Sequence, residues 1–448
     1  MQRDWIGDLV AQLHTGAITR RDFARRAAAI GLSATLIGQA LRVSAAAQDA
    51  SGAKASDIGQ QNVEHITDTS KGVIKLYSSW PLTGSSEQIG GDAVQAINLA
   101  LDDFGRAAGG FSLEYEALDD GIAANNGSWD AGKESENANL VVNDPDCMFY
   151  LATYNSGAAQ ISIPITNEAG LAQISYANTY PGLTKSFEGV TEEGEPDKFY
   201  PTGKRNYART VPADDIQGTA AARWAYGENG NRKAYVLHDN QPYGKGVAQV
   251  FRLEFEKEGG EVLGFEGFDP NSPDYQSLMA SIADTQPDIV YLGAIVNLNA
   301  SKLLMDMRDF MPADQVTFLG PDGLINQDFV TGAGDAAEGA YITFGGVPAG
   351  ALEGPGADYA TRMQEILGHE PDAYAMYAYE TAVVVIQSID KVGEKDRAKL
   401  VESMLQTTEF NSLLGGSWSF TETGDTSSTA MGLNQVQDGK IVYLKAIG

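Results

Sequence analysis

The fold is decided by residues 146–184, which read DCMFYLATYNSGAAQISIPITNEAGLAQISYANTYPGLT. Two short apolar runs in this stretch, residues 148–152 and 172–175, have the length and composition of buried strands. The residues between them, 157–168, predict a helix. A strand, a helix and a second strand in this order are typical of a parallel sheet.

Both predicted strands end in small residues that carry hydroxyl or amide groups. Asn155 and Ser156 follow the first strand, and Asn178 and Thr179 follow the second. In an open parallel sheet, ligands lie beyond the carboxyl ends of the strands, where helix N-termini and loop amides face an anion. We therefore expect these four residues to line one crevice that binds a small ligand with a carboxylate or carbonyl group.

The alternation of strands and helices extends along most of the chain. Strands are predicted at residues 73–78, 111–118, 233–238, 262–268, 289–294, 316–319 and 340–344, and helices at 85–104, 129–142, 216–226, 244–258, 275–283 and 299–308. An irregular, charged segment at 187–207 divides the pattern into two runs, which predicts two similar α/β lobes, each with a doubly wound parallel sheet. Helices follow between 358 and 405, and residues 415–447 alternate like an antiparallel edge.

The N-terminus has the pattern of a targeting segment. Arg20 and Arg21 precede Phe23, an Ala-rich apolar run follows at 27–41, and Ser44-Ala45-Ala46-Ala47 matches a cleavage site. This order is similar to a twin-arginine signal, so residues 1–47 are predicted to be a signal peptide that directs export of the folded protein to the periplasm. The alternative is an amphipathic helix with fortuitous arginines. Residues 48–71 are polar and are predicted to form a flexible leader.

Composition excludes several classes of function. The formal net charge is −29, from 60 acidic and 31 basic residues, which argues against nucleic acid or an anionic membrane as a partner. The one cysteine, Cys147, cannot form an internal disulfide and is expected to be a buried apolar residue. The four histidines are scattered and no motif of a hydrolase, kinase or metalloenzyme is found, so we predict no catalytic residue, cofactor or metal.

Acidic pairs carry little signal by themselves. Asp214-Asp215, like Asp102-Asp103 and Asp119-Asp120, consists of sequence neighbours that diverge on a helix or strand, which is typical of solvated caps and loop ends. Two other residues follow predicted strands of the second run: Tyr243 in HDNQPYG (238–244) and Asp322 in GPDG (320–323). The ordinary alternatives are core packing for Tyr243 and a turn for Asp322, since Pro-Asp-Gly favours turns.

Several short segments, taken together, carry a resemblance that covers residues 72–448. They are Pro81-Leu82-Thr83-Gly84, Asn155-Ser156-Gly157-Ala158, Tyr207-Ala208-Arg209-Thr210, Tyr243-Gly244-Lys245-Gly246 and Gly320-Pro321-Asp322-Gly323. In order and spacing the chain resembles the substrate-binding proteins of branched-chain amino acid ABC transporters, which are type I periplasmic binding proteins.

The resemblance implies two α/β lobes joined by a hinge of three crossover strands, with residues 72–208 plus 348–416 in one lobe and 211–346 plus 418–448 in the other. It implies that Asn155, Ser156, Asn178 and Thr179 bind a ligand carboxylate. Asp322 would bind the ligand ammonium and Tyr243 would lie against the ligand. The implied partner is an ABC transporter permease in the inner membrane.

The chain also departs from the family pattern. Ile89 stands where many members place an aromatic residue, no aromatic residue follows Tyr291-Leu292, the family disulfide is absent, and residues 188–204 are longer than usual. The sequence therefore leaves alternatives open: a protein of the same fold that binds an amide, urea or a carboxylate, an exported enzyme, or a ligand-sensing subunit that docks on a membrane receptor.

Overall fold

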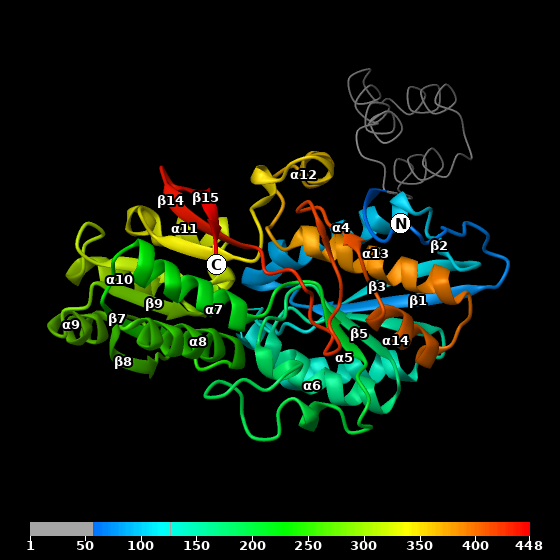
Figure 1. Ribbon diagram of the computed structural model, residues 1–448, viewed down its shortest axis with the longest axis horizontal. Coiled ribbons are helices and arrows are strands. Elements are labelled where there is room, and N and C mark those ends of the chain that lie inside the picture. Colours follow the sequence, from blue (N-terminus) through cyan, green and yellow to red (C-terminus); the bar gives the residue numbers. More distant parts are fainter. Residues whose placement is uncertain (1–56, 126) are drawn as a thin grey trace, which may run out of the picture. The chain divides into compact units, whose positions relative to one another are not determined.

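The computed structural model describes residues 57–125 and 127–448 (Figure 1). The predicted signal peptide, 1–47, and the first part of the predicted leader lie outside the described residues. Among the helices that are described, none is long and apolar enough to cross a membrane.

Within the described ranges the strands form two large sheets and one small ribbon. The first sheet has six strands in the order β2-β3-β1-β4-β5-β6, and all neighbours in it are parallel except β2 and β3. Its strands are β1 (Val73–Trp80), β2 (Ala107–Ala108), β3 (Phe111–Asp119), β4 (Cys147–Ala152), β5 (Ala172–Ser175) and β6 (Tyr207–Arg209).

The second sheet has seven described strands in the order β15-β14-β11-β10-β9-β7-β8. Five of them are parallel, and β14 and β15 form an antiparallel hairpin at one edge. The strands are β7 (Lys233–His238), β8 (Glu261–Gly267), β9 (Ile289–Gly293), β10 (Thr317–Gly320), β11 (Tyr341–Phe344), β14 (Met431–Gln437) and β15 (Lys440–Ile447). The ribbon pairs β12 (Phe410–Asn411) with β13 (Ser417–Trp418).

Helices cover both faces of each sheet. Figure 1 shows α4 and α13 on one side of the first sheet and α5 and α6 on the other. The described α-helices are α4 (Glu87–Asp103), α5 (Ala131–Asn143), α6 (Ser156–Glu168), α7 (Asp214–Arg223), α8 (Pro242–Glu258), α9 (Gln276–Asp284), α10 (Ala300–Phe310), α11 (Gln327–Ala333), α12 (Pro355–Leu367), α13 (Ala375–Val392) and α14 (Arg397–Leu405).

Successive side chains of the central strands enter two different cores. In β9, Tyr291 packs in the cluster that contains the apolar residues of α7 and α8, whereas Val290 and Leu292 pack with those of α9, α10 and α11. A strand that is buried on both faces reads as a continuous apolar run, which is why these strands could be found from sequence. The predicted α/β fold with two lobes, each built on a mostly parallel sheet, is confirmed.

The part of the predicted leader that the structure describes is docked on the protein, so the prediction of flexibility does not hold there. Gly59 pairs with Asn411 through two backbone hydrogen bonds of 3.0 Å. The Ile66 amide donates to Asp390 Oδ1 at 3.1 Å, and His65 Nδ1 lies 2.9 Å from Asp390 Oδ2. Its few apolar residues include Ile58, which is buried. The polar composition of this segment suggested flexibility, but the segment is held in place mainly by hydrogen bonds, which polar residues can form.

The last connection between the lobes comes later in the chain than the sequence placed it. Residues 418–426 stay with the first lobe: the Phe420 amide donates to the Thr407 carbonyl at 2.9 Å, and Asp425 pairs with Arg209 of β6. The chain joins the second sheet only at β14. The alternating pattern that begins at Trp418 therefore includes a segment of the first lobe. Alternation in a sequence indicates that a strand is paired, but it does not identify the strand or the lobe with which it pairs.

The buried ion pair between Arg209 and Asp425 yields a stability prediction. The Arg209 side chain is fully buried, and its Nε lies 2.7 Å from Asp425 Oδ1. Asp425→Asn leaves a buried charge without its counterion, so we expect the free energy of unfolding in urea at pH 7 to fall by about 3–5 kcal/mol. The matched control is Asp438→Asn in the exposed β14–β15 turn. A similar, small loss in both variants would contradict the prediction.

The same pair predicts a pH dependence. Burial raises the pKa of Asp425, but the charges of Arg209 and Lys185 and the hydrogen bonds to the carboxylate outweigh burial and hold this pKa at about 2. Because an unfolded Asp has a pKa of about 3.9, the carboxylate stabilises the fold above that pH, and this contribution is lost as the pH falls toward 2. The stability difference between the natural protein and Asp425→Asn should therefore shrink over this range; a constant difference in urea melts would argue against it.

Candidate functional site

The first part of the site lies at the N-terminus of α6. Asn155 is the residue that precedes the helix and Ser156 is its first residue, so both stand where free backbone N–H groups face outward. Ser156 is buried, and its Oγ accepts a hydrogen bond from the Tyr180 amide at 3.3 Å. This arrangement suits an anionic group, because the helix dipole adds to the free donors.

Asn178 and Thr179 follow β5 and are buried. The Asn178 side chain is used inside the lobe: its Nδ2 donates to the Tyr154 carbonyl at 2.9 Å, and its Oδ1 accepts from Tyr207 Oη at 3.0 Å. The Thr179 carbonyl accepts from the Asp214 amide at 2.8 Å, which ties the loop to the start of α7. Asn178 thus connects the loops after β4 and β5.

Arg209 fixes the loop that carries Asn178 and Thr179. Its Nη1 donates to the Asn178 carbonyl at 3.2 Å and to the Tyr180 carbonyl at 2.8 Å, and its Nη2 donates to Thr184 Oγ1 at 2.5 Å. With the ion pair to Asp425, every nitrogen of the guanidinium has a partner, which is what a fully buried charge requires.

In the second lobe the structure brings Tyr243 and Asp322 together. Tyr243 is the second residue of α8, and Asp322 begins a short 3-10 turn after β10. The Tyr243 hydroxyl donates to Asp322 Oδ1 at 2.5 Å and accepts from the Gly323 amide at 2.8 Å. A Cβ at position 323 would lie only 2.8 Å from the Tyr243 hydroxyl, so a glycine permits this approach.

Tyr374, which sequence reasoning missed, reaches the same acid from the first lobe. It precedes α13, and its hydroxyl donates to Asp322 Oδ2. The Tyr374 ring packs edge-on against Tyr154 and Phe344, with centroids 5.7 and 5.4 Å away. No signal in the neighbouring sequence marks Tyr374, because its role depends on a contact between residues 52 positions apart.

Asp214 is the second residue that the sequence did not reveal. It is the first residue of α7 and fully buried, and neither of its carboxylate oxygens accepts a hydrogen bond from the described chain. The interpretation of Asp214-Asp215 as a solvated pair is therefore wrong for Asp214, whereas the partly exposed Asp215 pairs with Lys185 at 2.9 Å. Burial first, and then the charge of Asp322, raise the pKa of Asp214 well above its usual value.

The pKa of Asp322 is also raised, because burial outweighs the hydrogen bonds from Tyr243 and Tyr374. Two carboxyl groups that affect each other's ionisation therefore lie on the second-lobe side of the site. Two more buried polar atoms, Gln217 Oε1 and the Tyr291 hydroxyl, have no partner among the described residues. Most of these atoms are acceptors, so the chemistry of this end suits a positively charged group with several N–H donors.

The two ends meet at a small cavity of about 20 Å³. Residues of both lobes line it: Tyr154, Asn155, Ser156, Ala177, Tyr243, Ile295, Gly323 and Tyr374. Three predicted site residues, Asn155, Ser156 and Tyr243, are therefore at the cavity, and Asp322 lies directly behind the two tyrosine hydroxyls. Asn178 and Thr179 do not line the cavity.

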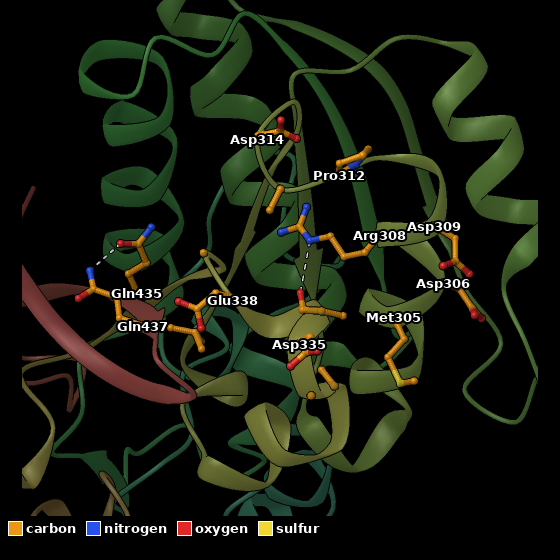
Figure 2. A pocket seen from close by; sticks show the side chains of 16 residues that line it. Met305, Asp306, Arg308, Asp309, Pro312, Asp314, Asp335, Glu338, Gln435 and Gln437 are labelled. Carbon is orange, nitrogen blue, oxygen red and sulfur yellow. Dashed lines mark hydrogen bonds between the residues drawn. The ribbon is translucent and has the colours of Figure 1, made fainter.

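A wider hollow of about 910 Å³ lies elsewhere in the second lobe (Figure 2). It is lined by several acids and by Arg308, whose side chain donates to the carbonyls of Ala336 and Val316 at 3.3 and 2.9 Å. It contains none of the predicted site residues, and it adjoins the start of β10 and β11, the opposite end of the sheet from Asp322. In the described residues, no group of three or more His, Cys, Asp or Glu could hold a metal ion.

Comparisons with known proteins identify the family of the chain and its fold. A family model described as periplasmic binding protein matches residues 74–440. The chain is 26% identical over 277 residues to the Leu/Ile/Val-binding protein homolog 1 of Brucella suis biovar 1 (strain 1330), covering 62% of this chain and 68% of the relative. It is 26% identical over 344 residues to the leucine-, isoleucine-, valine-, threonine-, and alanine-binding protein of Pseudomonas aeruginosa, covering 75% and 83%.

Solved structures show the same fold. A leucine-binding protein from Thermotoga maritima MSB8 has a TM-score of 0.72 at 21% identity, covering 84% of this chain and 99% of that one. A solute-binding protein from R. palustris in complex with benzoate has a TM-score of 0.69 at 20% identity, covering 84% and 96%. As the sequence predicted, the chain belongs to the periplasmic binding protein family, whose members bind solutes and catalyse no reaction.

Proposed function

We propose that this protein is the solute-binding component of an ABC importer and captures a small α-amino acid between its two lobes. The observation that supports this most is the opposite polarity of the two sides of the cavity. The first lobe presents the N-terminus of α6, and the second presents buried acids. A zwitterion removed from water needs both of its charges satisfied, and this arrangement offers a partner for each.

The carboxylate of the ligand would bind at Asn155 and Ser156. Backbone N–H groups of the first turn of α6 and the Ser156 hydroxyl are donors for an anion, and charge-assisted hydrogen bonds of this kind are stronger than neutral ones. Asn178 and Thr179 support this half of the site by holding the loop after β5 in place.

The ammonium of the ligand would bind at Asp322. A carboxylate can accept about four hydrogen bonds, and the hydroxyls of Tyr243 and Tyr374 use one on each oxygen. Capacity for an ammonium therefore remains. Burial and the charge of Asp322 raise the pKa of Asp214, and a bound ammonium nearby would favour the ionised form of this second carboxyl group. In this assignment Tyr243 orients Asp322 and borders the ligand.

Because the two charges would be bound by different lobes, the ligand stabilises the closed arrangement more than an open one. Because of this difference in affinity, ligand binding shifts the protein toward the closed form, and the closed form distinguishes a liganded protein from an empty one. We assign the closed form as the one recognised by a permease in the inner membrane, after export of the protein to the periplasm by the twin-arginine signal at 1–47.

A second candidate is a carboxylate without an ammonium group. It is favoured by the observation that both oxygens of Asp322 already accept hydrogen bonds from tyrosines. Proteins of this fold from R. palustris have been solved with benzoate and with 4-hydroxybenzoate. Such a ligand would use Asn155 and Ser156 but would leave Asp214 and Asp322 without a cation.

A thermal-shift screen of residues 48–448 tests the two candidates against each other. The panel contains α-amino acids, their amides, urea, benzoate and 4-hydroxybenzoate. A ligand present at a thousand times its Kd adds about 4 kcal/mol to the free energy of unfolding, which gives a clear rise in Tm. We expect free α-amino acids to raise the Tm. A rise with benzoates or amides alone would overturn the amino acid assignment.

The role of Asp322 predicts the effect of a single substitution. Asp322→Asn removes the negative charge and keeps the shape, so binding of the amino acid found in the screen should weaken by about 2–5 kcal/mol in titration calorimetry. The matched control is Asp328→Asn on α11, an exposed acid six residues away, which should leave the affinity unchanged. Unchanged affinity of Asp322→Asn would remove Asp322 from the site.

A further inference from the structure

The three connections between the lobes meet at Gly345 and Gly346. A Cβ at position 345 would lie 3.0 Å from Cδ of Pro212, which is in the first connection. A Cβ at Gly432, where the last connection enters β14, would lie 2.2 Å from the Gly346 carbonyl oxygen. The φ angle of Gly346 is +115°, which L-residues rarely adopt. Two successive glycines have no side chain that restricts the backbone, so we expect bending between the lobes to concentrate at this pair, the hinge.

Helix α13 of the first lobe contacts two of these connections. The Tyr377 hydroxyl donates a hydrogen bond to the Gly345 carbonyl. The hydroxyls of Thr381 and Thr210 are hydrogen-bonded to each other at 3.0 Å. Residues 377 and 381 are one helical turn apart, so they lie on the same face of α13. All residues from 375 to 390 are buried, which gives both contacts a fixed base.

The two hydrogen bonds lie on different sides of the hinge. Thr210 belongs with the first lobe, since its amide donates to the Ser175 carbonyl of β5 at 3.1 Å. Gly345 directly follows β11 of the second sheet. The bond from Tyr377 therefore joins the two lobes, whereas the bond between Thr381 and Thr210 joins two parts of one lobe. Rotation of the second lobe about the glycines separates the Gly345 carbonyl from Tyr377 and leaves the other bond in place.

We propose that Tyr377 is a positioning residue of the hinge, whose hydrogen bond to the Gly345 carbonyl stabilises the closed arrangement and thereby raises the affinity for the solute. Tyr377 does not line the cavity, so it acts without touching the solute. This inference goes beyond the proposed function and does not depend on which class of solute is bound.

Burial makes this hydrogen bond specific to the closed arrangement. Tyr377 and Gly345 are both buried, so water cannot replace either partner while the lobes are closed. Bending at the glycines separates the pair and lets water reach the carbonyl. A buried carbonyl that loses its donor costs more free energy than an exposed one, which accepts from water instead. Removal of the Tyr377 hydroxyl therefore destabilises the closed arrangement more than an open one.

An aromatic contact connects the hinge to the cavity. The Phe344 ring, at the end of β11, packs against the rings of Tyr377 and Tyr374, with centroids 6.1 and 5.4 Å away. Tyr374 lines the cavity. A movement of Phe344 with the second lobe therefore changes the surroundings of the cavity and of Tyr377 together.

The test compares the natural protein with Tyr377→Phe, which removes only the hydroxyl. The matched control is Thr381→Val, which removes a buried hydrogen bond from the same helix on the first-lobe side. Small-angle X-ray scattering gives the radius of gyration of each protein alone and during titration with L-leucine, L-alanine and benzoate. Urea unfolding shows that both variants fold.

Tyr377→Phe should need about tenfold more of a compacting solute than the natural protein to reach half of the change in radius, because the buried carbonyl has lost its donor. In stopped-flow measurements this change should come from faster dissociation of the solute rather than slower association. Thr381→Val should match the natural protein in both measurements, although its stability falls as well.

Equal changes in Tyr377→Phe and Thr381→Val, or no change in either, would overturn the inference. If none of the three solutes compacts the natural protein, the proteins alone decide: a larger radius for Tyr377→Phe than for Thr381→Val supports the role of Tyr377, and equal radii overturn it. Compaction by benzoate and by neither amino acid would end the amino acid assignment of the proposed function, and the role of Tyr377 is then decided with benzoate.

Discussion

The buried guanidinium of Arg209 is the constraint on which the rest of the structure depends. It lies at the end of β6, where the chain leaves the first sheet, and it joins β6 to two segments that are distant from each other in sequence. It binds the carbonyls of Asn178 and Tyr180 in the loop of the candidate site, the Thr184 hydroxyl, and Asp425 in the returning C-terminal segment. A charge at this depth is tolerated only when every donor is satisfied, so it specifies all three positions together. The site loop is thereby fixed by the same contacts that close the first lobe.

Buried charged groups are not all paired in this protein. In the first lobe the guanidinium of Arg209 has a partner for every nitrogen, whereas neither carboxylate oxygen of the buried Asp120 has a partner within the described chain. On the second-lobe side, neither carboxylate oxygen of Asp214 accepts a hydrogen bond within the described chain by geometry, and Asp322 accepts hydrogen bonds from the hydroxyls of Tyr243 and Tyr374. Unpaired buried carboxyls destabilise a fold, and they persist where function needs them. We infer that the protein gives up some stability at this point so that a positively charged group is bound strongly.

Much of the fold could be predicted because parallel strands buried on both faces are continuous apolar runs. The strand predicted at 172–175 coincides with β5, and the helix predicted at 157–168 differs from α6 by one residue. The position of the last connection between the lobes and the docking of the segment near Ile66 could not be predicted, because hydrogen bonds between distant segments leave no periodic pattern in the sequence. The candidate site divides in the same way. Asn155 and Asp322 follow strands and could be found by position, whereas Tyr374 reaches the cavity only through tertiary packing. The binding roles of all these residues stay predictions.

The single cysteine has a practical consequence. Cys147 is buried at the start of β4, and burial raises the pKa of its thiol to about 12. Only the thiolate reacts with maleimides and similar reagents, so this group is inert at neutral pH. A cysteine introduced at an exposed position near the rim of the cavity would then be the one reactive thiol of the chain. The natural sequence is therefore already suited to carrying one fluorescent dye, and a protein that closes around its solute could serve as an optical sensor without further removal of cysteines.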